Sequence, residues 1–373
     1  MSMLAYKIST FTDCVQKTLF PRLEEAGLQL TPKLHRLVEI LELLRIEEFV
    51  KRPSSHVRGV KPKDRRCLAR AFVAFYYYGG NDRNAFCGRL LVDANLRKVC
   101  GWEYSNQVPS PSTFCRAFKL FAETTLADST HVSKVKEWYN DVVVWHSAID
   151  SSAISVRERP AKRPKKDAAS PKEKKKPGPR GKDAPPADPV ELTRLQRQID
   201  QEPEISLIEI PTVCDWGTKK SSKGKEFHWT GYKLHAGVTE RGVPMIGITT
   251  SASLHDSQVA IIIMKTIHQR VETVFYDLGD KAYDAAPIRQ VSDSLGHCPI
   301  IDRKKRRGEM DIIPMEPDRA ETYKGRTAVE RFFARIKDEV GGDNIRVRGH
   351  AKVHAHLMFG LLVIFADQLL RIT

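Results

Sequence analysis

Apolar residues recur every three or four positions through the first 140 residues, which is the spacing of amphipathic helices. One such stretch covers 34–46. A second lies within 61–80 and ends at a pair of glycines, as helices often do. A third helix is expected within 81–102. The pattern therefore predicts an all-α N-terminal domain over 1–140.

A fourth helix is expected after VPSPS, because Ser110 suits an N-cap and Pro111 suits the first helical position. Its buried seam would consist of phenylalanines, whereas Arg116 and Lys119 would face outward. Together with the short helices before it, this helix is compatible with a helix-turn-helix reader of DNA. A plain helical bundle with a basic surface is the alternative. Arg116 and Lys119 are our DNA-binding candidates in this part.

The pattern changes at VVVWHSAID, where β-branched residues predict a strand that ends at Asp150. Glu240-Arg241-Gly242 reads as the tight turn of a hairpin. Helices are expected between and after the strands, so the chain is of the α/β class. The five expected strands cover 143–150, 228–239, 243–250, 271–277 and 298–302. LMFGLLVIFA at 357–366 is about half a membrane span and predicts a buried helix.

Residues 157–204 interrupt this pattern with Lys, Arg and Pro and few apolar residues. Such a segment cannot bury enough surface to fold alone, so we expect a disordered basic insertion. It could follow DNA phosphates or act as a solvated linker. The segment 189–201 is compatible with a short helix that leads back to the core.

Acidic side chains gather near the ends of expected strands. Asp150 either faces a cleft or opens a turn. Asp277 is the last residue of the strand expected at 271–277, and Asp280 and Asp284 follow it. For Asp256 and for Asp284 we expect a structural role as helix N-caps.

The segment YKGRTAVERFFARIK at 323–337 predicts a helix with two different faces. Arg326, Glu330 and Lys337 project from one side, and apolar residues cover the other. One interpretation is a carboxylate aimed at a metal and a phosphate. The other is an ordinary amphipathic helix whose charges face water.

The order Tyr323, Arg326, Glu330, Lys337 resembles the signature of DDE transposases encoded by bacterial insertion sequences. AID at 148–150, GYKLH at 231–235, HDS at 255–257 and GDKAYD at 279–284 resemble the same family in the same order. The resemblance implies a ribonuclease H-like core with a mixed five-stranded sheet over 141–373. It also implies that Asp150, Asp280 and Glu330 are the catalytic residues and metal ligands, with Asp277 as the alternative to Asp280.

The activity implied is cleavage at the ends of an insertion sequence and transfer of the 3′-hydroxyl into target DNA. Mg²⁺ would be the cofactor, with Mn²⁺ able to substitute, because carboxylate oxygens suit hard cations. Tyr323, Arg326 and Lys337 would contact DNA phosphate. Trp216 and Trp229 are weak candidates for holding a flipped base, and a hairpin step stays undecided. A catalytically silent DNA-binding protein and a nuclease without strand transfer are the alternatives.

The net charge of +15 and the pI near 9.4 favour a polyanionic partner. Lys233, Arg346 and Arg348 are further candidates for DNA contact, as is the cationic loop KKRRG at 304–308. Three histidines after Arg348 could belong to this basic patch or pack in the core. By the resemblance, the partners would be the terminal inverted repeats, target DNA and a second copy of the chain.

The seven cysteines are scattered, and no CxxC pair supports a zinc ribbon. No GxxxxGK[ST] loop points to ATP use. The first residues lack the apolar region of a signal peptide. We therefore expect a protein of the reducing cytoplasm that associates with the nucleoid and not with a membrane.

Overall fold

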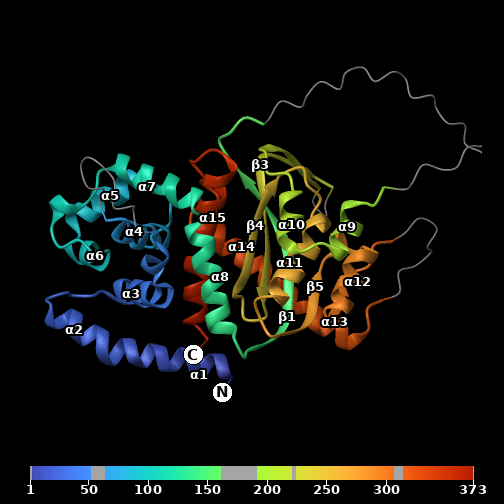
Figure 1. Cartoon of the computed structure of the whole chain (residues 1–373), viewed down its shortest axis with the longest axis horizontal. Helices are drawn as coiled ribbons and strands as arrows, with labels where there is room; N and C mark the ends of the chain where they lie inside the picture. The colour runs from blue at the N-terminus through green and yellow to red at the C-terminus, as the bar shows by residue number, and fades with distance from the viewer. Residues whose placement is uncertain (1, 52–63, 161–190, 221–223, 306–313, 373) are drawn as a thin grey trace, which may run out of the picture.

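The computed structural model describes residues 2–51, 64–160, 191–220, 224–305 and 314–372. A layer of helices and a sheet flanked by helices lie on the two sides of a long C-terminal helix (Figure 1). The helical layer contains α1 (Met3–Cys14), a π-helical turn (Val15–Leu19), α2 (Phe20–Glu25), α3 (Pro32–Leu44), α4 (Arg65–Tyr77), α5 (Arg83–Val92), α6 (Ala94–Val99), α7 (Pro111–Glu123) and α8 (Leu126–Tyr139).

The sheet contains β1 (Val143–Ser155), β2 (Asp215–Lys220), β3 (Glu226–Thr239), β4 (Pro244–Ser251), β5 (Thr273–Gly279) and β6 (Cys298–Ile301). β1 pairs antiparallel with β3 and parallel with β5, and β6 continues the parallel side. β4 borders the other edge of β3. The mixed α/β sheet of the ribonuclease H type is therefore confirmed. The described residues form six strands where five were expected. The additional strand, β2, pairs antiparallel with the first residues of β3 and forms a hairpin with it.

The remaining helices are α9 (Arg194–Asp200), α10 (Pro203–Ile208), α11 (Ser257–His268), α12 (Ala286–Ser294), α13 (Pro317–Tyr323), α14 (Thr327–Asp338) and α15 (His350–Leu369). α15 contains the predicted apolar run and is buried along most of its length. It packs against α3, α4, α7 and α8 on one side and against β4 and α14 on the other (Figure 1). One hydrophobic core consequently continues from the helical layer into the sheet. Among the described residues, no helix has the length and apolar character needed to cross a membrane.

The helix expected within 81–102 is in fact two helices. Asp93 ends α5, and its carboxylate accepts a hydrogen bond from the Leu96 backbone at 2.9 Å, which starts α6. Ser110 occupies the N-cap position of α7, as predicted. Its hydroxyl, however, contacts those of Ser112 and Thr113 and makes no capping bond.

Asp256 occupies the N-cap position of α11, as predicted, whereas the predicted cap by Asp284 is wrong. Asp256 precedes α11 but makes no side-chain cap there, because Lys233 Nζ donates to its carboxylate at 2.8 Å. Asp284 pairs with Arg289 at 3.0 Å, and α12 begins after Ala285. Local sequence placed both carboxylates correctly at helix starts, but long cationic side chains captured them.

The prediction of a disordered insertion over 157–204 is wrong for its last part, where the short helix expected within 189–201 is present. Residues 194–200 form α9, capped by Thr193, and α10 follows directly. Both helices pack on α11, and Gln198 is fully buried there. Apolar and amide side chains in this part provide the buried surface that the lysine-rich part lacks. Residues 161–190, and 306–308 of the predicted cationic loop, lie outside the described part.

Candidate active site

Two of the predicted carboxylates lie just beyond the paired stretch of two neighbouring strands. β1 and β5 are parallel neighbours, and Ala148 is in register with Leu278. Asp150 and Asp280 each follow two residues later. The predicted end of the first strand at Asp150 is wrong, because β1 continues to Ser155 by pairing with β3. Asp280 lies just beyond β5, where its carboxylate accepts a hydrogen bond from the Ala282 backbone at 2.8 Å. The charge of Asp280 acts to raise the pKa of Asp150, as expected for carboxylates on neighbouring strands.

The third carboxylate, Glu330, comes from α14, which packs across β1 and β3 through Val329, Phe332 and Ile336. Arg326 links it to the sheet. Arg326 Nη1 lies 3.3 Å from Asp150 Oδ2, and Arg326 Nη2 lies 2.5 Å from Glu330 Oε1. The structure thus brings Asp150, Asp280 and Glu330 to one region, with a guanidinium between two of them.

Burial raises the pKa of Asp150 to about 6, and the charge of Asp280 acts in the same direction. A hydrogen bond from the Ser151 backbone and the charges of Arg326 and Lys219 only partly oppose this. A carboxylate that is difficult to ionise in the folded protein gains from a nearby cation. Such perturbed groups are concentrated at functional sites.

Asp150→Asn is therefore expected to stabilise the metal-free protein by about 2 kcal/mol at neutral to weakly alkaline pH. The gap between a pKa of about 6 and the ordinary 3.8 corresponds to about 3 kcal/mol, and losing the contact with Arg326 offsets part of it. Because the folded-state pKa is raised, the gain should shrink as the pH falls through about 6. Urea unfolding across this pH range in EDTA measures it. Lower stability than wild type above pH 6 would contradict this explanation, and Asp338→Asn, an exposed carboxylate, is the control.

Asp277, the alternative to Asp280, has a different environment. It is 2% exposed and accepts hydrogen bonds from Ser292 Oγ at 2.7 Å and His297 Nδ1 at 2.9 Å. These contacts fasten β5 to α12 and to the start of β6. Asp280 lies at the strand end beside Asp150, whereas Asp277 is occupied inside the fold. The structure therefore favours Asp280 as the partner of Asp150.

The chemistry of these donors fits a hard divalent cation, since all three are carboxylates and two sit at one strand edge. In the described residues no group of three His, Cys, Asp or Glu side chains is close enough together to hold a metal ion. Two of the acids, Asp150 and Glu330, pair with Arg326 instead. A guanidinium between carboxylates satisfies the charge that a metal would otherwise satisfy, so metal binding would require this side chain to move.

Lys233 and Asp256 form an ion pair beside the site, and this pairing was not predicted from the sequence. Lys233 donates to Asp256 and to the Leu254 carbonyl, each at 2.8 Å, and is therefore occupied. Burial acts to raise the pKa of Asp256, but His235, Lys233 and hydrogen bonds bring it below its usual range. Of the two, Lys233 is the relevant cation near neutral pH, because burial lowers the pKa of His235 to about 4. The sequence did contain a signal for this pair, since Lys233 lies in GYKLH at 231–235 and Asp256 lies in HDS at 255–257, two of the motifs that resemble the family.

The other predicted DNA contacts are spread over the molecule. Tyr323 is half-buried, with its ring 5.9 Å from the Arg326 guanidinium, and Lys337 lies two turns after Glu330 on α14. Arg116 and Lys119 are exposed on α7. These two positions are remote in sequence from the carboxylates and belong to the helical layer.

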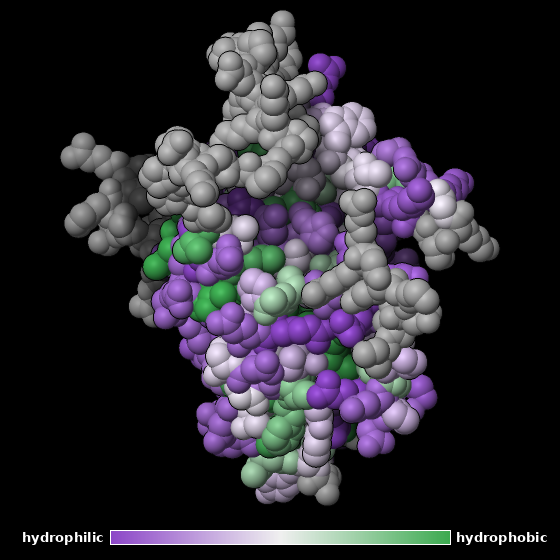
Figure 2. Space-filling view, turned by 90° about the vertical axis from the view of Figure 1, so that its right-hand side faces the viewer, coloured by the Kyte–Doolittle hydropathy of each residue, from purple (hydrophilic) through white to green (hydrophobic). Residues whose placement is uncertain are grey.

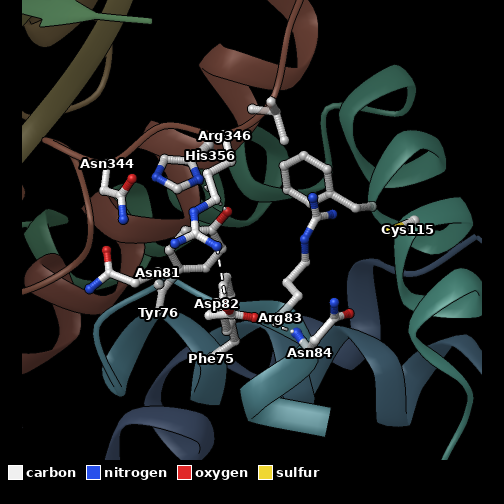
Figure 3. A pocket seen from close by; sticks show the side chains of 13 residues that line it. Phe75, Tyr76, Asn81, Asp82, Arg83, Asn84, Cys115, Asn344, Arg346 and His356 are labelled. Carbon is white, nitrogen blue, oxygen red and sulfur yellow. Dashed lines mark hydrogen bonds and ion pairs between the residues drawn. The ribbon is translucent and has the colours of Figure 1, made fainter. Parts of the chain in front are cut away.

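Arg346 and Arg348 follow α14. Arg346 lies 3.2 Å from Asp82 in a cavity of about 210 Å³ between the helical layer and the C-terminal segment (Figure 3). Arg348 donates to the Arg157 carbonyl at 2.9 Å. Both arginines have partners within the protein, which DNA phosphates would have to replace.

The three C-terminal histidines each have a partner within the protein, and His356 is buried whereas His350 and His354 are half-buried. His354 bonds to Asp128 at 2.7 Å, and His356 to Tyr76 at 3.0 Å. His350 bonds to the Thr249 carbonyl at 2.8 Å. They connect α15 to β4 and to the helical layer.

The two tryptophans differ in exposure. Trp229 is buried and donates to the Tyr232 carbonyl, so it cannot hold a base without rearrangement. Trp216 is exposed on the neighbouring strand β2.

Figure 2 shows the side of the molecule on which α9, α12 and α13 lie. The described residues of this face are largely hydrophilic, with separate apolar spots.

Comparison with protein families gives two matches. The family model described as Transposase DDE domain matches residues 145–366, which is more than half of the chain. The model described as Transposase domain (DUF772) matches residues 25–120, within the helical layer. Comparisons with curated proteins and with solved structures give no match. The first match includes all three carboxylates and Arg326.

Proposed function

The chain belongs to the family of transposases with a DDE domain, and from this premise we propose that it cuts DNA at the ends of an insertion sequence and joins the freed ends to target DNA. The observation that supports this most is the convergence of Asp150, Asp280 and Glu330 from three elements, with Arg326 between Asp150 and Glu330. If the charged residues of this helix only faced water, Arg326 would not pair with the partly buried Asp150 of β1. The family match provides the class of reaction, and the geometry suggests the residues.

Asp150, Asp280 and Glu330 would hold Mg²⁺, or Mn²⁺ in its place. When bound, two such ions activate the attacking oxygen and stabilise the leaving oxygen of a phosphodiester. In the first step, water attacks phosphorus, the bond to the 3′-oxygen breaks, and a 3′-hydroxyl and a 5′-phosphate remain. In the second, that hydroxyl attacks a target phosphodiester and displaces its 3′-oxygen.

Arg326 has two roles in this proposal. Without DNA it neutralises Asp150 and Glu330. With DNA it turns its planar donor fork to the phosphate beside the scissile bond, which releases both carboxylates. Lys337 would add a point charge along the same helix face, and Tyr323 would place a ring and a hydroxyl beside Arg326. The exchange explains why an arginine rather than a neutral residue occupies this position.

We also propose that the helical layer binds the terminal inverted repeats, with exposed Arg116 and Lys119 on α7 contacting phosphates. Support comes from the transposase model matched over 25–120 and from the basic character of the chain. Two copies would bring both ends of the element together. The layer shares its core with the sheet through α15, so bound DNA would be held rigidly relative to the carboxylates.

The proposal is tested with purified protein, Mg²⁺, and DNA that carries the inverted repeats flanking the gene. We expect cleavage at the 3′ ends and joining of those ends to a target plasmid, and neither in EDTA. Cleavage without joining would show a nuclease, and binding without cleavage would show a catalytically silent DNA-binding protein. Either result contradicts the transposase proposal.

A further inference from the structure

Tyr283 is a buried phenol with an unusual position. It is 2% exposed and ends the short 3₁₀ helix Lys281–Tyr283 that follows Asp280. Its ring packs on Gly279, where an added Cβ would lie 3.1 Å from the Tyr283 Cβ. In the described part of the chain its hydroxyl has no hydrogen-bond partner. Burying a hydroxyl in this way costs free energy, so its presence needs an explanation.

Tyr283 borders the proposed active site, since its backbone N–H donates to the Asp280 carbonyl at 3.0 Å. Besides burial, the charges of Asp150, Asp256 and Asp280 raise the pKa of Tyr283 well above its ordinary value, and Arg326 opposes them. These four groups come from four separate segments. The hydroxyl therefore keeps its proton and is a neutral donor among carboxylates.

The three carboxylates differ in how firmly they are already held. Asp256 accepts from Lys233, and Asp280 accepts from the Ala282 backbone, each at 2.8 Å. Asp150 has one oxygen on the Ser151 backbone at 2.7 Å and the other on Arg326 at 3.3 Å. The Asp150 to Arg326 contact is the longest of these. It is also the one that is lost if Arg326 turns to DNA.

We propose that Tyr283 is a positioning residue whose hydroxyl donates a hydrogen bond to the Asp150 carboxylate once Arg326 leaves it. That bond holds Asp150 in the orientation that receives the divalent cation. The inference rests on the proposed function, because it concerns the same site. While Arg326 is in place, each oxygen of Asp150 already accepts one bond, and the departure of Arg326 leaves Oδ2 to the Tyr283 hydroxyl.

The test is Tyr283→Phe, with Tyr139→Phe as the matched control. Tyr139 is also 2% exposed but belongs to α8, away from the carboxylates. Two quantities are measured on the whole protein: the thermal midpoint in EDTA, and Mn²⁺ affinity by calorimetry with uncut DNA ends bound.

We expect Tyr283→Phe to keep or raise the thermal midpoint in EDTA, because it removes a hydroxyl that has no partner. We expect its Mn²⁺ affinity to fall by about tenfold, as for other residues that orient metal ligands. Tyr139→Phe should bind Mn²⁺ like wild type. Unchanged Mn²⁺ affinity in Tyr283→Phe would overturn the inference. So would a lower midpoint or failure to fold, since the hydroxyl would then be structural.

These outcomes are separable from failure of the proposed function. If wild type neither binds Mn²⁺ nor cleaves DNA, the proposed function fails. If wild type does both and Tyr283→Phe matches it in Mn²⁺ affinity, only the role of Tyr283 fails.

Discussion

Glu330→Gln is expected to abolish cleavage of terminal-repeat DNA while leaving binding of that DNA nearly unchanged. The amide has the same shape but lacks the charge that would hold a divalent cation. A loss of at least about 1000-fold corresponds to about 4 kcal/mol of transition-state stabilisation. Glu330 is 51% exposed at its side chain, so the fold should tolerate the change. Gel shift and end-labelled cleavage assays measure the two effects.

The matched control is Glu321→Gln, an exposed glutamate of α13 that pairs with Lys324. It should cleave like wild type. Retained cleavage in Glu330→Gln would remove this residue from the site. Loss of DNA binding together with cleavage would mean that Glu330 serves the fold or the interface instead.

The second large effect should distinguish Asp277, which lies within β5, from Asp280, which lies just beyond it. We expect Asp280→Asn to lose cleavage by about 1000-fold, with a change in unfolding free energy below about 1 kcal/mol. Asp277→Asn should instead lower the unfolding free energy by about 2–3 kcal/mol. It weakens the buried bonds to Ser292 and His297. Urea unfolding and the cleavage assay are performed on both variants.

The two variants are controls for each other, since each changes one carboxylate of the same segment to an amide. If Asp277→Asn retains its fold yet loses cleavage, while Asp280→Asn cleaves normally, the assignment reverses. Equal losses of stability and activity in both would mean that neither aspartate is specific to the chemistry.

Much of the fold could be predicted because it depends on local patterns. The β-branched run before Asp150 and the hairpin at Glu240-Arg241-Gly242 are visible in the sequence, and the structure confirms both. The parallel register of β1 and β5 then brings Asp150 and Asp280 to one edge. The resemblance suggested the pairing of these acids with Glu330, and nothing in local sequence would have connected residues so far apart.

The sequence could not show which cationic side chain pairs with which carboxylate. Lys233 of β3 pairs with Asp256, and Arg289 pairs with Asp284 from within α12, the helix that Asp284 was expected to cap. The sequence also could not show that the Tyr283 hydroxyl is buried without a hydrogen-bond partner, because this depends on how the core packs. The break at Asp93 was missed because the apolar spacing continues across it.

Three acids should share a divalent cation once Arg326 has turned to DNA. The decisive measurement is a crystal structure of the protein with a DNA end and Mn²⁺, with data collected at the manganese absorption edge. We expect an anomalous peak bound by Asp150 and Asp280, with Glu330 completing the site and Arg326 on a phosphate. A peak held by other residues, or Arg326 still between Asp150 and Glu330 beside bound DNA, would refute this arrangement.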